Sequence, residues 1–479
     1  MVADTPSTRL PYNSPKAYVK NILVRQTGIL WHKCEWPRYA RFQHSGLRRK
    51  TRASPCGPLV SREKMRLRRC LAPFLGSGVD GPPWGSPVRI LHVTPSFYPA
   101  WAYGGIPRCA YELCRSLVGL GESVTVWTTD ACDATQRLGE PETTVDGIFV
   151  RRFRNLHNGL AYHRQLYLPL GILKAPWHDL AEFDVVHIHS HRHLLEALVG
   201  AAAAQRGIPY VFTGNGTVPP IERYVLVKRV LDLLGADAIL EHAAACVAVS
   251  EAEIPHYRAV GVAASRIRVI PNGVRLDEFA ALPPRGSFRR AYGLGDGPLL
   301  VFVGKITPRK GVDVLLRALA RLPRDVQLVV AGNFMMPEQP IRAIVEELHL
   351  HERVRFPGLL LGDDRNAAYV DADVVAYPST DEIFGLVAAE ALMCQTPVVV
   401  CDDSGCGEVV RAAAGGRLVP YGDAGALAVA LQALLNDRAE RARCALSGRR
   451  YVEEHLGWER IAADTRALYR EVAGGAASG

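Results

Sequence analysis

The sequence is poor in the features that mark a zinc site, a disulfide framework or a membrane span. Its 479 residues include eleven cysteines, but these are scattered without a Cys-x-x-Cys pair or a regular spacing. Unpaired thiols of this kind are typical of a reducing compartment. No run approaches the eighteen uninterrupted apolar residues that a transmembrane helix requires. We therefore expect a cytoplasmic protein without a membrane-spanning segment.

The excess of positive charge is confined to one end of the chain. The net charge is +9, yet residues 1–87 alone contain 16 Lys and Arg against 4 Asp and Glu, a net of +12. The remainder holds 41 basic and 44 acidic residues, a net of −3. A nucleic-acid-binding core is not supported, because it would need a basic surface of its own.

Residues 1–87 combine Pro, Ser, Gly and clustered Arg without a sustained apolar period, which is typical of disorder. They lack the charged-then-apolar arrangement of a secretory signal. One interpretation is a polybasic arm that is attracted to the inner face of a membrane. The interpretation that we favour is an over-extended reading frame, with the protein starting near Met65 or Val88. A native peptide mapped to residues 1–60 would refute it.

From Val88 onward, short apolar runs alternate with longer helical patterns. The first half has predicted helices over 107–119 and 194–206, between strands over 89–94, 123–128, 185–189, 210–213 and 245–249. The pattern restarts after a polar linker, with strands over 298–304, 327–331, 354–357, 374–377, 397–400 and 417–419. The helices between these strands are predicted over 313–321, 340–347, 387–393, 408–413 and 424–435.

Strands separated by helices of this length form parallel βαβ units. The sequence therefore predicts an α/β protein with two Rossmann-like, doubly wound domains that face each other across a cleft. We expect a first domain over 88–275, a linker over 276–297, a second domain over 298–450, and a C-terminal helix and tail over 451–479. The ligand should lie where the carboxyl ends of the strands of both domains meet.

The most informative motif holds two glutamates, Glu382 and Glu390, eight residues apart with Phe384 and Gly385 between them. Helix formers begin at Gly385, so a loop turns into a helix there. A helix start presents free N–H groups and a positive dipole to a phosphate. The loop carboxylate would repel that phosphate but can accept hydrogen bonds from sugar hydroxyls. This pattern predicts a site for a sugar joined to a phosphate, at the helix start formed by Phe384, Gly385 and Leu386.

Two cations precede that motif in the second domain. Lys305 and Lys310 lie five residues apart, directly after the strand that ends near Gly304. Cations at the carboxyl edge of a sheet can neutralise a departing diphosphate. Without the glutamate motif, a solvated basic loop would be the better explanation. The loop is not a P-loop, because Gly-x-x-x-x-Gly-Lys-Ser/Thr is absent.

In the first domain, paired glycines follow the first strand. Gly104 and Gly105 precede a predicted helix, and their small size lets backbone N–H groups approach a diphosphate. They do not form Gly-x-Gly-x-x-Gly, so a dinucleotide-binding fold is disfavoured.

Four histidines alternate at positions 187, 189, 191 and 193. On a strand they would share one face, which suggests a metal site. Only residues up to His189 belong to the predicted strand, so we expect no metal. We expect His189 or His191 to line the cleft, and His187 to be a buried residue with its hydrogen bonds satisfied.

Two other polar clusters have ordinary explanations. Ser250 and Glu253 are predicted to form a capping box at the start of a helix. Residues 402–408 resemble a metal-binding loop in composition, but a plain loop and helix start is the better interpretation.

Taken in order, these landmarks resemble glycosyltransferase family 4, the retaining GT-B glycosyltransferases. The resemblance runs from about residue 88 to 469 and includes the family's Glu-x7-Glu signature. It implies that Lys305 and Lys310 contact the donor diphosphate and that Glu382 binds the donor sugar. It also implies that Glu390 holds the nucleotide ribose. The motifs that carry it are Gly104-Gly105, Val247-Ala248-Val249-Ser250-Glu251, Val269-Ile270-Pro271-Asn272-Gly273-Val274, Val303-Gly304-Lys305, Lys310-Gly311, Phe356-Pro357-Gly358 and Glu382-x-Phe384-Gly385.

The chain departs from the family at two positions. Lys305 stands where the family usually has Arg, which keeps the charge but loses the bidentate fork. Asn215 stands where the family usually has a histidine near the reacting sugar. Asn215 can hydrogen-bond a hydroxyl in the acceptor and sugar pocket but cannot titrate. The family's front-face retaining mechanism is thought to let the leaving phosphate take the acceptor's proton, so a protein base is not strictly required.

We therefore predict a retaining, metal-independent glycosyltransferase without a cofactor, which transfers a sugar from a nucleoside-diphosphate sugar to a hydroxyl. The acceptor would be a cell-surface glycan, a lipid-linked saccharide or a small molecule, and peripheral membrane association would accompany the first two. One alternative is a nucleotide-sugar epimerase or hydrolase on the same fold. Another is a non-catalytic nucleotide-sugar-binding module, suggested by Asn215 and Lys305.

Overall fold

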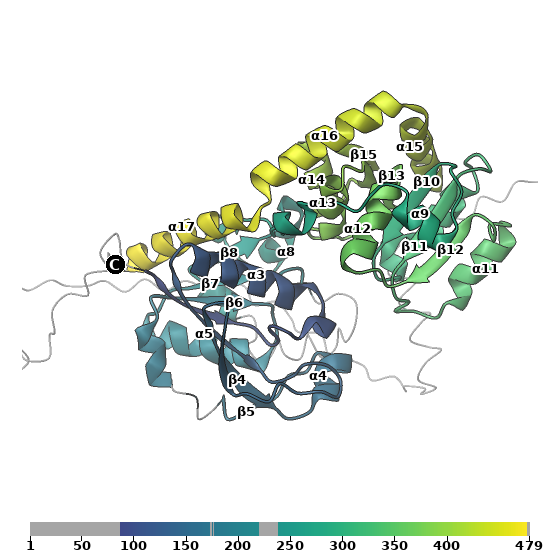
Figure 1. Cartoon of the computed structure of the whole chain (residues 1–479). Coiled ribbons are helices and arrows are strands. Elements are labelled where there is room, and N and C mark those ends of the chain that lie inside the picture. Colours follow the sequence, from purple (N-terminus) through teal and green to yellow (C-terminus); the bar gives the residue numbers. More distant parts are fainter. Residues whose placement is uncertain (1–86, 173–174, 176, 220–237, 477–479) are drawn as a thin grey trace, which may run out of the picture. The chain divides into compact units, whose positions relative to one another are not determined.

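The computed structural model describes residues 87–172, 175, 177–219 and 238–476, all of which belong to one compact unit. The predictions made for residues 1–86, a disordered basic extension and an over-extended start, lie outside the described residues. The described chain builds two sheets, each covered by helices (Figure 1).

The first sheet is mostly parallel. Its strand order is β3-β4-β2-β1-β6-β7-β8-β9, and β5 pairs with β4. Strands β3 and β5 are antiparallel to β4, and the other pairings are parallel. The bounds are β1 Arg89–Val93, β2 Ser123–Thr129, β3 Glu142–Val145, β4 Ile148–Asn155, β5 Pro169–Leu170, β6 Val185–His189, β7 Tyr210–Thr213, β8 Ala245–Ala248 and β9 Ile267–Val269.

The helices that accompany this sheet follow its strands, as expected for a doubly wound arrangement. They are α3 Gly105–Gly119, α4 Asn158–Arg164, α5 Leu194–Arg206, α7 Ala238–Glu241 and α8 Ile254–Ala259.

The second sheet is parallel throughout, with the strand order β12-β11-β10-β13-β14-β15. Its strands are β10 Leu299–Val303, β11 Gln327–Ala331, β12 Val354–Gly358, β13 Val374–Tyr377, β14 Val398–Cys401 and β15 Gly416–Val419. Its helices are α9 Ser287–Tyr292, α10 Val312–Leu319, α11 Gln339–Glu347, α12 Gly362–Asp371, α13 Leu386–Met393, α14 Gly405–Ala413, α15 Ala424–Asn436 and α16 Arg438–His455. The predicted fold class is confirmed by the two sheets.

Several elements were not predicted. Strands β3 and β4 form a hairpin around Asp146 and Gly147, both of which have positive φ angles of 49° and 79°. The Asp-Gly pair is the signal that would have found this hairpin, because it favours a type I′ turn. Helices α12 and α16 are rich in charged residues, so their apolar periodicity is weak.

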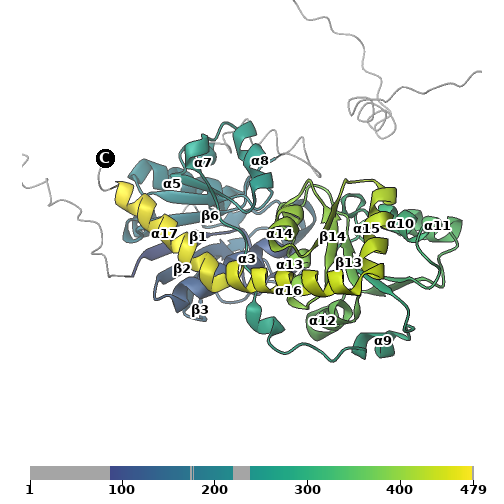
Figure 2. The ribbon, with the colours of Figure 1, turned by 90° about the horizontal axis from the view of Figure 1, so that it is seen from above.

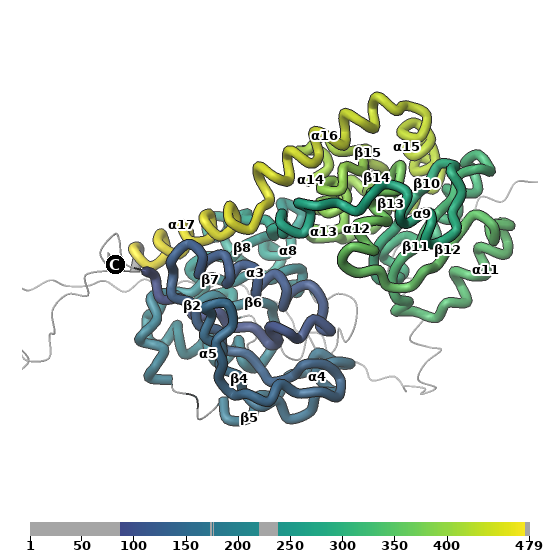
Figure 3. The backbone as a smooth tube through the Cα atoms, in the orientation of Figure 1, coloured from purple at the N-terminus to yellow at the C-terminus, as the bar shows by residue number. Residues whose placement is uncertain are grey.

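The last helix, α17 (Trp458–Ala476), packs on the first sheet although it follows the second in sequence. Figure 2 shows it lying across β1 and β2 beside α3. Its apolar residues Trp458, Ile461, Leu468 and Tyr469 belong to the same buried cluster as Ile90 of β1. The chain therefore passes between the sheets twice, before α9 and between α16 and α17 (Figure 3).

None of the helices among the described residues combines the length and the apolar character that a bilayer crossing requires.

One buried acid has no compensating partner. Glu196, in the first turn of α5, is 1 % exposed, and neither of its carboxylate oxygens has a hydrogen-bond partner. Burial raises its pKa to about 8, against an ordinary value of 4.5. Between these two pH values the folded protein holds a proton that the unfolded chain releases. Because the unfolded chain releases this proton first, the free energy of unfolding falls as the pH rises from about 4.5 to about 8.

The substitution Glu196→Gln removes that ionisation and keeps the shape of the neutral acid. We expect the melting temperature of the variant to exceed that of the wild type by roughly 4 °C or more above pH 8, because each kcal/mol shifts it by about 2–4 °C. At pH 5 the two proteins should melt together. Thermal unfolding measured across this pH range provides the check. Glu182→Gln, at an exposed position, should show no such pH-dependent difference. A constant gap between wild type and Glu196→Gln would contradict the interpretation.

Candidate active site

The loop that carries Glu382 connects β13 to α13, at the carboxyl edge of the second sheet. Gly385 caps α13 with a φ of +68°, in the left-handed region that favours glycine. A Cβ atom on Gly385 would lie 1.9 Å from Cys406 Sγ and 2.9 Å from Glu382 Cγ. Only glycine therefore lets the start of α13 lie this close to both the glutamate and α14.

Glu382 is the centre of a buried polar cluster. Its Oε2 atom accepts hydrogen bonds from Lys310 Nζ, from Tyr377 Oη at 3.1 Å and from Ser379 Oγ at 3.1 Å. Lys310 also donates to Tyr377 Oη, and its Nζ atom lies 4.9 Å from the centre of that ring. Lys310 is only 9 % exposed. The sequence-predicted cation and carboxylate thus form one ion pair.

The charges of this cluster compensate each other. Burial alone would raise the pKa of Glu382, but Lys310 lowers it below its ordinary value, with help from Arg309 and Tyr377. Glu382 is therefore a carboxylate at neutral pH and can only accept hydrogen bonds. An ammonium group has three N–H donors, and Lys310 uses two of them within the cluster. One donor remains for a ligand.

Glu390 lies on α13 itself, and two side chains of α12 hold it in place. Its Oε1 atom accepts from Arg365 at 2.8 Å, and its Oε2 atom accepts from Tyr369 Oη at 3.3 Å. Arg365 also approaches Glu278 at 3.4 Å. Burial raises the pKa of Glu390, although Arg365 opposes that shift. These partners fix the position of the Glu390 carboxylate. Each of its oxygens accepts one hydrogen bond and can accept another.

The first sheet contributes its glycine loop to the same region. Gly104 has a φ of +109°, and a Cβ atom there would lie 3.7 Å from Lys305 Nζ. Lys305 is exposed, unlike Lys310. The structure therefore brings Gly104 next to the first of the two predicted lysines, whereas a Cβ atom on Gly105 would meet nothing within 4 Å.

Asn215 lies in a loop that two buried side chains clamp. Glu253 accepts hydrogen bonds from the N–H groups of Gly216 at 2.6 Å and Val249 at 2.8 Å. Tyr257 Oη accepts from Gly214 N–H at 2.7 Å. Burial raises the pKa of Glu253 to about 7.

The clamped loop faces the Glu382 loop. A Cβ atom on Gly216 would lie 3.0 Å from Ile383 Cγ1, next in sequence to Glu382. Asn215 itself adopts a φ of +48°, and its Oδ1 atom accepts from Asn272 Nδ2 at 3.2 Å. The predicted capping box is wrong, because the Ser250 side chain makes no capping bond and Glu253 holds the Asn215 loop.

The histidines at the centre of the first sheet form a hydrogen-bonded chain. His187 is bonded to Tyr469 Oη at 2.5 Å through Nδ1 and to Thr213 Oγ1 at 2.7 Å through Nε2. His92 Nδ1 lies 2.9 Å from His189 Nε2. His187 is therefore a buried residue with both ring nitrogens satisfied, as predicted.

The ring nitrogens of His92, His187 and His189 lie within 4.8 Å of one another, close enough to be considered as metal ligands. Burial lowers the pKa of His92 and His187 well below the ordinary value, and that of His189 to about 3, so all three are neutral. Protein groups already occupy both nitrogens of His187. A dication would have to displace these bonds and would meet no carboxylate among the three ligands.

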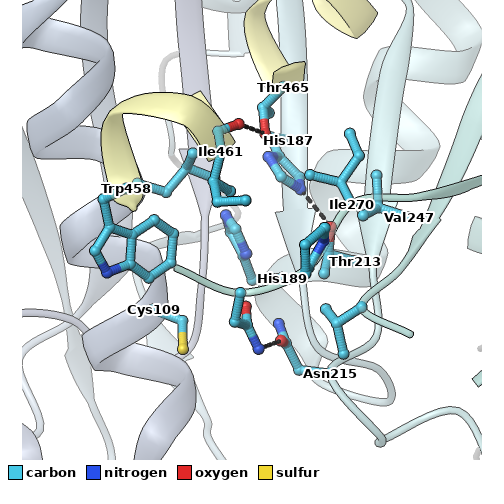
Figure 4. Close-up of a pocket in the computed structure, with 14 residues that line it drawn as sticks. Cys109, His187, His189, Thr213, Asn215, Val247, Ile270, Trp458, Ile461 and Thr465 are labelled. Atoms are coloured by element: carbon cyan, nitrogen blue, oxygen red, sulfur yellow. Dashed lines mark hydrogen bonds between the residues drawn. The ribbon is translucent and has the colours of Figure 1, made fainter. Parts of the chain in front are cut away.

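His189 and Asn215 line the same small cavity, of about 30 Å³, together with Cys109, Asn272 and Trp458 (Figure 4). That space can hold one or two water molecules. His191, the other predicted lining residue, packs instead against Phe212, with the ring centroids 5.8 Å apart.

Residues 402–408 form a loop and a helix start, as predicted. Ser404 caps α14 by accepting from Gly407 N–H, and the Gly405 N–H donates to the Glu382 carbonyl at 2.7 Å. Glu408 accepts from the N–H groups of Glu251 at 2.9 Å and Ala252 at 2.6 Å. The loop thus supports the glutamate motif and contacts the first sheet.

Sequence reasoning missed the residues that hold the site together. The sequence places Tyr377 only on a predicted strand and Tyr469 only in the predicted C-terminal helix and tail. Arg365 and Tyr369 lie on an unpredicted helix. A buried carboxylate needs such donors, but no signal in the sequence says which Tyr or Arg provides them, because the partners are brought together only by the packing of the helices.

The link between α17 and the histidine chain can be tested with Tyr469→Phe. The variant leaves His187 Nδ1 buried without its partner, which we expect to cost about 1–3 kcal/mol of unfolding free energy. Chemical denaturation of the full chain gives that number. Tyr292→Phe, at a 38 % exposed tyrosine, is the matched control and should change stability by no more than about 0.5 kcal/mol. Equal effects of the two variants would show that the Tyr469 hydroxyl has no structural role.

Comparison with known proteins agrees with this geometry. Residues 285–451 match the family model described as "Glycosyl transferases group 1", and residues 103–278 match "Glycosyltransferase Family 4". A D-inositol 3-phosphate glycosyltransferase of Xylanimonas cellulosilytica is 32 % identical over 403 residues, covering 80 % of this chain and 95 % of the relative. The enzyme of the same name from Mycolicibacterium smegmatis is 30 % identical, covering 71 % of this chain and 80 % of the relative.

Among solved structures, sucrose-phosphate synthase from Thermosynechococcus elongatus superposes with a TM-score of 0.64 at 24 % identity, covering 81 % of this chain and all of the other. Anabaena HepE in complex with UDP superposes with a TM-score of 0.63 at 21 % identity, covering 80 % of this chain and all of the other. These likenesses show a shared GT-B fold. The chain belongs to the group 1 and family 4 glycosyltransferases, and it is a glycosyltransferase.

Proposed function

We propose that this enzyme transfers a sugar from a nucleoside-diphosphate sugar to a hydroxyl acceptor, with retention of the anomeric configuration. The observation that carries the proposal is the buried Lys310–Glu382 ion pair at the start of α13. It places one cation and one hydrogen-bond acceptor side by side, at a helix start that favours a phosphate. A sugar diphosphate carries the matching groups: its phosphate oxygens suit the cation and the helix start, and its sugar hydroxyls suit the hydrogen-bond acceptor.

The donor diphosphate would bind between the lysines and the glycine loop. Lys310 has one N–H left for a phosphate oxygen, and Lys305 lies beside Gly104. Two cations and a helix dipole can stabilise the negative charge that develops on the departing diphosphate. We propose that they do so without a divalent ion, so a chelator should not reduce the rate. The structure of HepE, which has a similar fold and was solved in complex with UDP, supports a nucleotide as part of the donor.

The two glutamates would bind different parts of the donor. Glu382 is a carboxylate, so it accepts hydrogen bonds from hydroxyls of the sugar that is transferred. Glu390, fixed by Arg365 and Tyr369, would accept from the hydroxyls of the ribose. The backbone at Phe384, Gly385 and Leu386 would contact the phosphates between them.

The transfer step needs no proton acceptor from Asn215. The bond between the anomeric carbon and the phosphate oxygen breaks, and the acceptor oxygen bonds to that carbon on the same face of the sugar. The acceptor's proton passes to the departing phosphate oxygen. Asn215, oriented by Asn272, would hydrogen-bond a hydroxyl near the reacting centre, beside His189.

The proposed acceptor is a hydroxyl of a cell-surface glycan or a glycolipid. The relatives named D-inositol 3-phosphate glycosyltransferase make a small phosphorylated polyol a second acceptor class to test. A panel of UDP-, GDP- and ADP-sugars, crossed with these acceptors, identifies both substrates by release of the nucleoside diphosphate. The anomeric coupling of the product, read by NMR, tests retention.

Glu382→Gln should abolish most of the transfer. The amide replaces two acceptor oxygens by one and loses its ion pair with Lys310. We expect kcat/KM to fall on the order of 100-fold or more, comparable with the loss of one oxyanion donor. Glu347→Gln, at a side chain that is 62 % exposed, should keep wild-type kinetics. Wild-type turnover by Glu382→Gln would refute the assignment.

A second pair of variants separates catalysis from folding. Lys310→Met leaves the buried Glu382 with Arg309, at 4.0 Å, as its remaining cation, and we expect a loss of about 3 kcal/mol in stability. Lys310→Met combined with Glu382→Gln removes both charges, so stability should largely return while transfer stays lost. Thermal unfolding and nucleotide release, measured on the same samples, distinguish the two effects. Recovery of transfer in the double variant would contradict a role in catalysis.

A further inference from the structure

Six charged side chains of alternating sign follow one another from α3 to α13. We call them the charge chain. Its members, in order, are Arg115 and Glu112 of α3, Arg275, Glu278 of the single turn Leu276–Phe279, Arg365 of α12 and Glu390 of α13. The distances between the charged atoms of successive members are 3.0, 3.7, 3.4, 3.4 and 2.8 Å. Glu390 is therefore the last member of a continuous series and not half of an isolated ion pair.

Arg365 is shared between two carboxylates. Its Nη1 atom donates to Glu390 at 2.8 Å, and its Nη2 atom donates to Glu278 at 3.4 Å. Protein groups enclose the guanidinium, which lies 5.7 Å from the centre of the Phe279 ring and donates to Asn366 Oδ1 at 3.1 and 3.2 Å. Because the Arg365 side chain is only 9 % exposed, water does little to screen its charge. The two acids therefore compete for one cation.

Arg275 balances Glu278 on its other side. The Nη1 atom of Arg275 lies 3.4 Å from Oε1 of Glu278, whereas Arg365 approaches Oε2. Each oxygen of Glu278 thus faces its own cation. Without Arg275, Arg365 would have to balance the whole charge of Glu278, whose side chain is 34 % exposed. Because opposite charges attract over these distances, Arg365 would shift toward Glu278 and away from Glu390.

The electrostatics of Glu390 agree with this competition. Burial raises the pKa of Glu390, Arg365 lowers it, and Glu278 raises it again, while Arg108 of α3 lowers it. A weaker contact with Arg365 would favour the protonated acid, in which one oxygen becomes a donor and fewer acceptors remain for a ligand. Arg275 thus acts on Glu390 without touching it.

We propose that Arg275 is a positioning residue for the nucleotide part of the donor, because by balancing Glu278 it keeps Arg365 on Glu390. This role rests on the proposed function, in which Glu390 binds the ribose hydroxyls. Arg275 also lies 3.7 Å from Glu112, a buried acid of α3. Since α3 begins at Gly105, the same arginine links the ribose site with the helix that follows the glycine loop.

The affinity for the ribose, separated from the affinity for the base and the phosphates, tests this role. Calorimetry on the full chain gives the dissociation constants of UDP, GDP and ADP and of their 2′,3′-dideoxy counterparts. The constant of the dideoxy form divided by that of the ribose form, which we call the ribose ratio, measures the contribution of the hydroxyls alone. For the diphosphate that binds most tightly, we expect a ribose ratio of about ten or more in the wild type and of about one in Glu390→Ala.

Arg275→Gln should lower the ribose ratio about fivefold, because Arg365 is drawn toward Glu278. Arg275→Met removes the same charge without adding an amide and should show the same loss. Arg275→Lys keeps the charge and should retain most of the wild-type ratio. Glu278→Gln alone should not lower it, since the acid that competes with Glu390 is gone.

The double variant Arg275→Gln with Glu278→Gln distinguishes positioning from a general structural role. We expect its ribose ratio to return to within about twofold of the wild-type value, because no charge at 278 then competes for Arg365. If Arg275 only supported the fold, the loss in the double variant would equal or exceed the loss in Arg275→Gln.

Arg417→Gln is the matched control. The Arg417 side chain is 39 % exposed, against 34 % for Arg275, and forms an ion pair with Glu440 at 2.9 Å. The pair joins β15 to α16, neither of which carries a residue of the proposed site. Its ribose ratio should equal that of the wild type, and melting temperatures measured on the same samples show that the variants are folded.

Two results would overturn the role of Arg275 and leave the proposed function intact. One is a wild-type ribose ratio in Arg275→Gln and Arg275→Met, and the other is a double variant that keeps the low ratio of Arg275→Gln. A wild type that binds none of the diphosphates, or that does not distinguish the ribose from the dideoxy form, would refute the proposed ribose site and this role together. None of these readouts requires sugar transfer, so the expected ratios without turnover would refute transfer alone.

Discussion

The site depends on one buried ion pair, between Lys310 and Glu382. A carboxylate this well covered is stable only when a cation and further hydrogen bonds compensate for lost water. Lys310, Tyr377 and Ser379 provide that compensation. The pair also dictates the backbone around it. Glycine is needed at 311, where a Cβ would lie 2.3 Å from the Pro378 carbonyl, as it is at 385. Geometry and charge are therefore fixed together before any ligand arrives.

The opposite wall of the site uses a different principle. The Asn215 loop has no ion pair and is instead held through its backbone, by Glu253 and Tyr257. Backbone clamping leaves the Asn215 side chain available to Asn272 and to a ligand. One wall thus fixes its side chains and the other fixes its main chain. This division suits the function that we propose, in which the donor is bound by charge and the acceptor by hydrogen bonds.

The sequence predicts most of the fold because parallel strands are buried on both faces and read as uninterrupted apolar runs. Strands β6, β7, β11 and β13 have the predicted bounds for that reason. The hairpin at Asp146-Gly147 was overlooked, and α12 and α16 are too polar to show a clear period. At the site, the pairing of Lys310 with Glu382 could not be predicted, since the two are far apart in sequence. Nor could the part played by Arg365 and Tyr369, which depends on how α12 packs on α13.

The return of α17 to the first sheet has a consequence for biosynthesis. Trp458, Ile461 and Tyr469 complete the apolar core on one face of that sheet, yet they leave the ribosome only after the whole second sheet has been synthesised. Domains generally fold as units while synthesis proceeds from the N-terminus. Here the part of that face beside α3 stays uncovered until α17 has been synthesised. The first sheet therefore completes its core after the second, although its strands are made first.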